Sequence, residues 1–265
     1  MREICKSGST RGSNGTGESR PLLSTLPVKK IQIHLSGGSE DWTSRGDKIS
    51  TGGGGLGWVV GRFMKISIYT GGFVQTNGYL VETPDGNLLI DAPEGVAGWL
   101  GQRGVRVDDV LLTHQHYDHV MDAAELKAGG ARLHAYEDYS PELTLEKPAR
   151  TWGLPIAVRP YVVDRHFAMD ERLRIAGLEL ALAHVPGHSL DSVTFYVVGA
   201  GVLFSGDTLF AGSIGRTDLP GGSTKQLLDG IGRHLMTLPE ETRVFPGHGP
   251  ATTIGEEAVN NPYLD

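Results

Sequence analysis

Thr113-His114-Gln115-His116-Tyr117-Asp118-His119 is the stretch that decides the fold of this 265-residue chain. Its last six positions hold three histidines and one aspartate, and it ends an apolar strand predicted at 107–113. His114 and His116 stand two residues apart, so in an extended backbone both side chains point to the same face. Asp118 and His119 fall where a following helix would begin, and that bend can direct them at a second point nearby. The spacing therefore predicts two neighbouring metal sites.

Three further loops share one arrangement, in which a strand runs into a turn that presents a polar side chain. They are Val185-Pro186-Gly187-His188-Ser189, Ser205-Gly206-Asp207-Thr208 and Phe245-Pro246-Gly247-His248-Gly249. Each loop alone would be interpreted as an ordinary turn. Together with the histidine-rich stretch, they supply imidazole and carboxylate donors of the kind that bind Zn, Fe or Mn. The shared arrangement argues against the alternative of a surface histidine cluster.

The chain from residue 64 onward alternates short strands with helices. The sequence pattern predicts strands at 65–69, 79–83, 87–91, 107–113, 173–176, 178–185, 192–198, 202–205 and 243–245. It predicts helices at 93–103, 118–128 and 224–238. This order is typical of an α/β fold with mixed sheets and helices outside.

Residues 1–63 differ in composition from the remainder, with 13 Gly, 9 Ser and no sustained apolar period. Such a segment buries too little apolar surface to offset its ordering entropy, so we expect disorder, with a short strand within 22–35. Met64 opens the first patterned segment, so it could equally be the natural start of translation, with residues 1–63 a spurious upstream extension. A regulatory or targeting arm is the alternative. Residues 64–265 are expected to form the catalytic domain.

Charge and cysteine content restrict the function. The formal charge is −7, with +4 on residues 1–63 and −11 on residues 64–265. An acidic domain does not attract nucleic acid or anionic lipid by its overall field. The single cysteine, Cys5, cannot form an intramolecular disulfide, and no apolar run approaches the roughly 18 residues that a membrane span needs. We therefore expect a cytoplasmic protein that acts on a small molecule and binds neither nucleic acid nor membrane.

The polar motifs, taken in chain order, resemble the metal signature of the metallo-β-lactamase superfamily. The resemblance covers residues 64–265 and implies an αββα sandwich of two mixed β-sheets with helices on the outer faces. It also implies two divalent metal ions, most simply Zn, with Fe or Mn as alternatives. By resemblance, one ion would be held by His114, His116 and His188. The second would be held by Asp118, His119 and His248, and Asp207 would bridge both.

The segments 211–218 and 246–264 resemble short bacterial proteins of the glyoxalase II-like (hydroxyacylglutathione hydrolase-like) group. That resemblance implies hydrolysis of a thioester, such as S-D-lactoylglutathione, by a metal-bridging hydroxide. We expect no counterpart of the C-terminal helical domain with which full-length glyoxalase II holds glutathione, and Asp218 replaces a Tyr of that enzyme. A persulfide dioxygenase, which is a mono-iron oxidoreductase of the same fold, and a lactonase are therefore the alternatives. Asp207 stands where a thiolate-type β-lactamase carries Cys, so antibiotic hydrolysis is not expected as the main role.

The same resemblance suggests roles for individual side chains. Asp118 is expected to be catalytic, orienting the hydroxide as well as binding metal. Asp91, at the end of a predicted strand, is expected to support the site from behind the metal ligands. Tyr117 and Arg216 are the candidate substrate contacts, and an ion pair between Arg216 and Asp218 is the structural alternative.

Overall fold

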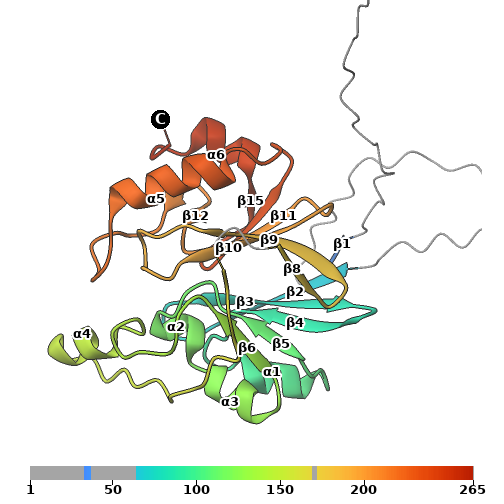
Figure 1. The fold of residues 1–265 in the computed structure, drawn as a ribbon, viewed down its shortest axis with the longest axis vertical. Helices are drawn as coiled ribbons and strands as arrows, with labels where there is room; N and C mark the ends of the chain where they lie inside the picture. The colour runs from blue at the N-terminus through green and yellow to red at the C-terminus, as the bar shows by residue number, and fades with distance from the viewer. Residues whose placement is uncertain (1–32, 37–63, 169–171, 265) are drawn as a thin grey trace, which may run out of the picture.

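Two β-sheets lie face to face in the computed structural model, which describes residues 33–36, 64–168 and 172–264 (Figure 1). The seven-stranded sheet joins its strands in chain order. Its members are β1 (Ile33–Ser36), β2 (Met64–Gly71), β3 (Thr76–Thr83), β4 (Gly86–Ile90), β5 (Asp109–Leu111), β6 (Arg132–Ala135) and β7 (Arg165–His166). Strands β2 to β4 form an antiparallel meander, whereas β4 to β7 run parallel.

The six-stranded sheet has the order β15-β14-β11-β10-β9-β8 and is also mixed, because β11 and β14 are parallel. Its members are β8 (Arg172–Ile175), β9 (Leu178–His184), β10 (Val193–Val197), β11 (Val202–Gly206), β14 (Arg243–Pro246) and β15 (Thr252–Thr253). A small hairpin joins β12 (Leu209–Phe210) to β13 (Ser213–Ile214).

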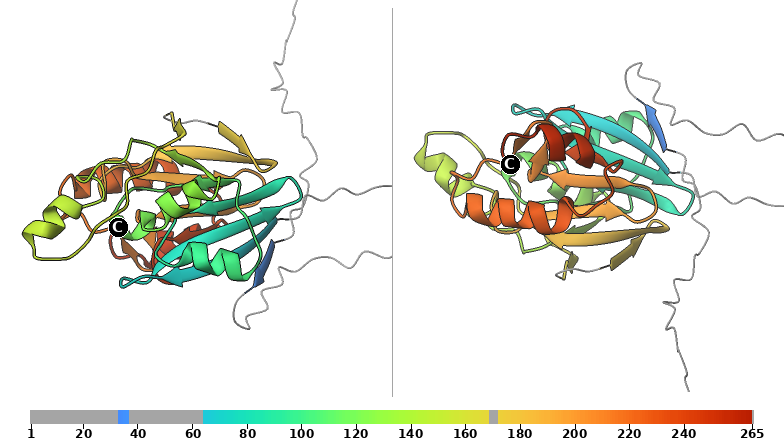
Figure 2. Two further views of the ribbon diagram at one scale, coloured as in Figure 1. Left: turned by 90° about the horizontal axis from the view of Figure 1, so that it is seen from below. Right: turned by 90° about the horizontal axis from the view of Figure 1, so that it is seen from above.

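Helices cover the outer face of each sheet, as all three views show (Figure 1, Figure 2). The seven-stranded sheet is covered by α1 (Val96–Gln102), α2 (Tyr117–Val120) and α3 (Ala123–Ala128), and α4 (Glu146–Thr151) projects beside them. The six-stranded sheet is covered by α5 (Thr224–Gly230), the π-helix η1 (Ile231–Leu235) that continues it, and α6 (Ile254–Asn260). The predicted αββα sandwich is confirmed.

Three apolar clusters fill the layers of this sandwich. The cluster between the sheets is centred on Phe195, Phe204 and Phe245, whose side chains are at most 1% exposed. A second cluster packs α1, α2 and α3 on the first sheet, and a third packs α5, η1 and α6 on the second sheet. Burying a large apolar side chain contributes about 1.5–3 kcal/mol, so these clusters hold the two sheets in a fixed relation.

The helices differ in detail from their predictions. The helix predicted at 118–128 is broken into α2 and α3 at Asp122, because Asp122 bonds elsewhere: its N–H donates to Ala92 O and its Oδ2 accepts from Ala97 N. The helix predicted at 224–238 changes to a π-helix after Gly230. Gly230 packs so closely on Val185 that a Cβ would overlap its side chain, which seats this helix on the strand below.

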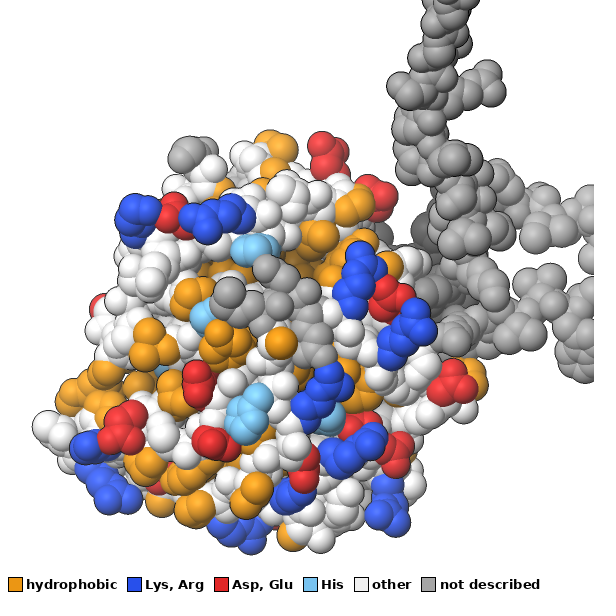
Figure 3. Space-filling view, in the orientation of Figure 1, with side chains coloured by type: hydrophobic (Ala, Val, Ile, Leu, Met, Phe, Trp, Pro, Cys, Tyr) orange, Lys and Arg blue, Asp and Glu red, His pale blue; other side chains and the backbone are white. Residues whose placement is uncertain are grey.

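The prediction for residues 1–63 lies almost entirely outside the described residues. The exception is the backbone of β1, which overlaps the strand expected within 22–35 and pairs in parallel with β2. Within the described residues, no helix is both long and apolar enough to cross a membrane. On the face drawn in Figure 3, acidic and basic side chains are interspersed with apolar ones.

Candidate metal centre

Four loops that follow strand ends bring the predicted ligands to one edge of the sandwich. The histidine-rich stretch follows β5, which ends at Leu111, and His188 follows β9. Because β11 and β14 are parallel neighbours, the loops after them leave the sheet side by side and carry Asp207 and His248. The two sheets meet here, since Val193 N at the start of β10 donates to Thr113 O. The carboxyl edge of parallel strands is the usual place for a site.

The seven predicted ligands form two sets of three with Asp207 between them. The first, called the histidine set, comprises His114, His116 and His188; the second, called the mixed set, comprises Asp118, His119 and His248. Within each set, one ligand atom per residue lies within 4.8 Å of the others. The structure therefore gathers each set closely enough for one ion to be shared by its three side chains.

Asp207 contacts both sets. Its Oδ2 lies 3.4 Å from His188 Nε2 and 3.3 Å from His248 Nε2, and its Oδ1 lies 3.4 Å from His119 Nε2. A carboxylate that contacts both sets could serve as a shared anionic ligand for two neighbouring cations. The structure thus places Asp207 where a bridging ligand would be required.

Asp91 lies behind the ligands and fixes the orientation of His119. Its Oδ2 accepts a hydrogen bond of 2.8 Å from His119 Nδ1, and its Oδ1 accepts one of 2.7 Å from Thr113 N. The Thr113 hydroxyl also donates to Asp91 Oδ2, at 2.8 Å. Such a carboxylate holds the opposite ring nitrogen of a histidine toward a metal. Asp91 adopts a left-handed conformation with a φ of 60°, which aims its carboxylate back into the site.

The protonation pattern of the other imidazoles follows from their partners. Because the Thr113 hydroxyl proton is used by Asp91, Thr113 Oγ1 can only accept from His114 Nδ1, 3.1 Å away. His188 Nδ1 donates to the carbonyl oxygen of Arg216 at 2.8 Å. Both bonds place the ring proton on Nδ1 and leave the lone pair on Nε2.

Four buried atoms at this edge have no hydrogen-bond partner within the described part of the chain. They are His114 Nε2, His119 Nε2, His188 Nε2 and Asp207 Oδ1. Buried polar atoms nearly always have a partner, and an unmade bond costs about 1–3 kcal/mol. Two divalent cations, one bound by each set, would give all four atoms a partner, so the residues fit a pair of metal ions.

The two sets differ in charge. Burial lowers the pKa of His116 to about 3 and that of His114 well below its usual value, so these two imidazoles are uncharged at neutral pH. Burial also opposes a charge on His119 and His248, but the nearby carboxylates outweigh it. Asp118 and Asp207 raise the pKa of His248 to about 10, and with Asp91 they hold that of His119 well above its usual value.

Two glycines permit the close approach of Asp207. At Gly215 a Cβ would overlap the carbonyl oxygen of Asp207, and at Gly247 it would overlap Asp207 Oδ1 and His119 Cε1. Neither position has room for a side chain. The turns that precede and follow the ligands therefore need glycine for space.

Three residues in the first half of β3 also contact the site, although the sequence did not predict them. Thr76 Oγ1 donates to Asp118 Oδ2 at 2.6 Å, and Asn77 Nδ2 donates to Pro246 O at 3.1 Å. The hydroxyl of Tyr79 donates to the same carbonyl at 2.5 Å. These residues lie in a strand that carries no metal-ligand motif, so the signal was absent from local sequence. Only the pairing of sheet and loop brings them to the site.

The two candidate substrate contacts differ in how far they are exposed to solvent. Tyr117 is half-buried and packs on the helix layer, where burial raises the pKa of its hydroxyl. Arg216 is exposed and makes a bidentate ion pair with Asp218, with Nε to Oδ1 at 2.8 Å and Nη2 to Oδ2 at 2.7 Å. The structural alternative for Arg216 is thus realised in this conformation.

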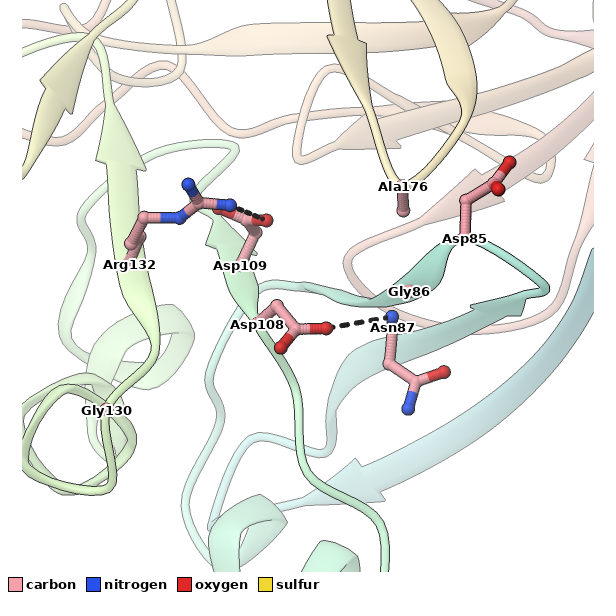
Figure 4. A pocket seen from close by; sticks show the side chains of 8 residues that line it. All are labelled: Asp85, Gly86, Asn87, Asp108, Asp109, Gly130, Arg132 and Ala176. Carbon is pink, nitrogen blue, oxygen red and sulfur yellow. Dashed lines mark hydrogen bonds and ion pairs between the residues drawn. The ribbon is translucent and has the colours of Figure 1, made fainter.

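A cavity of about 440 Å³ lies where β4, β5 and β6 begin, which is the opposite edge from the ligands. Two of its three carboxylates already have partners: Asp109 contacts Arg132 and His134, each at 2.7 Å, and Asp108 accepts from Asn87 N (Figure 4). Carboxylates that are paired in this way stabilise the strand ends. The cavity therefore contains no unsatisfied donor set comparable to the metal centre.

Residues 71–248 match the sequence model of the family described as the metallo-beta-lactamase superfamily. The probable metallo-hydrolase YqgX of Bacillus subtilis (strain 168) is 35% identical over 201 residues, which cover 73% of this chain and 94% of the relative. The hydroxyacylglutathione hydrolase GloC of Haemophilus influenzae is also 35% identical, over 210 residues that cover 76% of this chain and 99% of the relative.

Solved structures give the same picture. The BLEG-1 B3 metallo-beta-lactamase superposes with a TM-score of 0.68 at 33% identity, covering 75% of this chain and 99% of the other. TTHA1623 in a di-iron-bound form superposes with a TM-score of 0.65 at 42% identity, covering 74% and 99%. Because one of these neighbours holds iron, similarity alone does not select the metal.

Proposed function

Because this chain belongs to the metallo-β-lactamase superfamily and is a metal-dependent hydrolase, we propose that it hydrolyses a glutathione thioester with two divalent metal ions. The observation that carries the two-ion proposal is the contact of Asp207 with both ligand sets. Similarity to GloC over 99% of its length supports the substrate class. S-D-lactoylglutathione is the leading substrate, and zinc is the leading metal.

The seven proposed ligands would bind the two ions in separate sets. The histidine set would hold one ion, the mixed set would hold the other, and Asp207 would be shared. Such ions supply Lewis-acid polarisation of the carbonyl and a water nucleophile that is available near neutral pH. The chain itself contributes fixed ligand orientations, because Asp91, Thr113 and the Arg216 carbonyl hold three of the imidazole rings.

Asp118 is the proposed catalytic carboxylate. Burial would raise its pKa, but the charge of His119 and hydrogen bonds from His248 and Thr76 hold it at about 2. The carboxylate is therefore ionised at neutral pH. Its Oδ2 is occupied by Thr76, whereas Oδ1 takes no hydrogen bond from the residues that the structure describes. Oδ1 can accept a hydrogen bond from the attacking water and hold it in line with the carbonyl carbon.

Arg216 is the proposed contact for an anionic group of the substrate. Its partner Asp218 is exposed, and exposed ion pairs are weak because water screens them. A substrate carboxylate can therefore replace Asp218 on the same guanidinium fork. Tyr117 is the second proposed substrate contact.

The test is elemental analysis of the purified chain combined with a substrate panel. We expect two ions per chain and faster hydrolysis of S-D-lactoylglutathione than of a lactone or a β-lactam. A single iron with oxygen uptake on glutathione persulfide would overturn the proposal in favour of a dioxygenase. Preferential cleavage of the lactone or the β-lactam would overturn the substrate class.

Replacing Asp118 with Asn isolates its proposed catalytic role. The amide keeps the shape of the side chain and an oxygen that can bind metal, but it removes the charge. We expect kcat to fall more than the metal content does. Equal losses of kcat and metal content would show that Asp118 is only a ligand.

A further inference from the structure

Thr76 begins β3 and lies fully buried beside the mixed set. Its hydroxyl donates a hydrogen bond of 2.6 Å to Asp118 Oδ2, 42 positions away in the sequence. Its backbone forms an isolated antiparallel bridge with His248. Thr76 therefore contacts two of the three mixed-set residues. Its hydroxyl contacts the side chain of Asp118, and its main chain pairs with that of His248.

The hydroxyl selects which oxygen of Asp118 faces the imidazoles. Asp118 Oδ2 lies 3.3 Å from His119 Nε2 and 3.3 Å from His248 Nε2. A carboxylate can rotate about its Cβ–Cγ bond, so these distances require a restraint on Oδ2. The bond from Thr76 is short and involves an ionised acceptor, which makes it stronger than a bond between neutral groups.

Asn77 extends the same restraint to the loop that carries His248. Its backbone N–H donates to Gly247 O at 2.7 Å, and its Nδ2 donates to Pro246 O at 3.1 Å and to Gly249 O at 3.0 Å. The start of β3 thus clamps this loop of the other sheet. Two imidazoles of the histidine set have other supports, since His114 is held by Thr113 and His188 by the Arg216 carbonyl.

We propose that Thr76 is a positioning residue for the mixed set, and that its hydroxyl holds Asp118 Oδ2 toward His119 and His248. Tight binding of the ion in the mixed set, called the second ion, then depends on this hydroxyl. Binding of the ion in the histidine set, called the first ion, does not. This inference rests on the two-ion part of the proposed function. It assigns to a strand residue outside both ligand sets a share in the affinity for one of two neighbouring ions.

The experiment is a titration of the metal-depleted full chain with Co²⁺, followed by visible absorption and calorimetry. Thr76→Val removes the hydroxyl and keeps a β-branched side chain, whereas Thr76→Ser keeps the hydroxyl. In Thr76→Val we expect the second ion to bind about 10- to 100-fold more weakly and the first ion to bind as in the wild type. Thr76→Ser should restore the second ion. Thr76→Ala provides the same loss of hydroxyl if Thr76→Val does not fold.

Thr242→Val is the matched control. Thr242 is a fully buried threonine just before β14, at the end of that strand opposite to Pro246, and its hydroxyl has no partner among the described residues. Both affinities should be unchanged in this variant.

Three outcomes would overturn the inference: wild-type affinities in Thr76→Val, an equal weakening of both ions, or a single ion in the wild type. Failure of the wild type to cleave thioesters would instead overturn the proposed substrate, because ion binding is measured without substrate.

Discussion

The histidine set and the mixed set are neighbours that share Asp207 but are built on different principles. The histidine set consists of buried imidazoles, and burial lowers the pKa of His116 to about 3. The mixed set contains a carboxylate, and its two imidazoles carry raised pKa values because Asp118 and Asp207 lie beside them. One set is ready to receive a cation, whereas the other holds protons that a cation must displace.

This difference indicates how one site can bind two ions with unequal affinity. His114 and His188 of the histidine set are already held by a hydroxyl and a backbone carbonyl, so these two rings need no rearrangement to bind an ion. The mixed set depends on restraints that come from both sheets, namely Asp91 for His119 and Thr76 with Asn77 for Asp118 and the His248 loop. We therefore expect the histidine set to bind the first ion and the mixed set to bind the second.

The largest effect should come from the residue that both sets share. Asp207→Asn keeps the volume of the side chain but removes the charge between the sets. We expect kcat/KM to fall by about 1000-fold or more and both ions to weaken, because two cations would lose their common anion. The control is Asp109→Asn, a buried carboxylate at the opposite edge, which should lower thermal stability without changing ion content. Unchanged ion content in Asp207→Asn would contradict a bridging role.

Removing one imidazole from each set should separate them. His248→Ala should leave one tightly bound ion per chain. His116→Ala should lower the affinity for the first ion by more than about 100-fold, because losing a direct ligand weakens binding more than losing a residue that only supports a ligand. Calorimetric titration with Zn²⁺ would measure both. If the two variants have the same titration curve, the two sets are not independent.

Crowding at Gly247 should disturb the shared carboxylate without removing a ligand. A Cβ on this residue would overlap Asp207 Oδ1 and His119 Cε1, so Gly247→Ala should lower kcat by up to about 100-fold, the cost expected for a displacement of about 1 Å. Gly98→Ala is the matched control, because Gly98 lies in α1 with open space around it. That variant should be stabilised by about 0.5–1 kcal/mol with normal kcat. Wild-type kcat in Gly247→Ala would show that Asp207 has freedom to move.

The last and most gradual effect is the pH dependence of ion affinity. The raised pKa of His248, about 10, means that this ring is protonated at neutral pH and that an ion must displace its proton. The affinity of the second ion should therefore rise about tenfold per pH unit between pH 6 and 8 for each proton displaced. The first ion should change little, because His116 with its pKa of about 3 has already lost its proton. Parallel pH profiles would contradict the difference in charge.

The predicted ligands came from local motifs, and this is why they could be identified without coordinates. His114 and His116 follow β5 closely, Asp118 and His119 lie in the short helix α2 that comes next, and each of the other three ligands follows a glycine in the loop after a strand. The position of each ligand is therefore encoded by residues near it in the sequence. Thr76 has no such context. Its role depends on contacts with Asp118 and His248, which are 42 and 172 positions away.

The layered architecture was predicted from a family resemblance, whereas the breaks in the helices were not. Asp122 interrupts the helical pattern of 118–128 by bonding to Ala92 and Ala97, and a periodicity argument cannot include partners outside the helix. The short strands β12 and β13 and the helix α6 were also missed, because segments of two to seven residues have too little periodicity to stand out.

Asp91 shows how narrowly a site can restrict the choice of amino acid. Its left-handed backbone disfavours most side chains, and its two oxygens must accept from Thr113 and His119. Glycine would relax the backbone but remove the acceptors, and glutamate would keep the charge but suit the conformation less well. Random mutation at this position should therefore yield almost no functional substitutes, although Asp91 touches neither ion nor substrate in the proposed reaction. Tolerance to mutation is thus lowest where geometry and chemistry impose independent demands on the same residue.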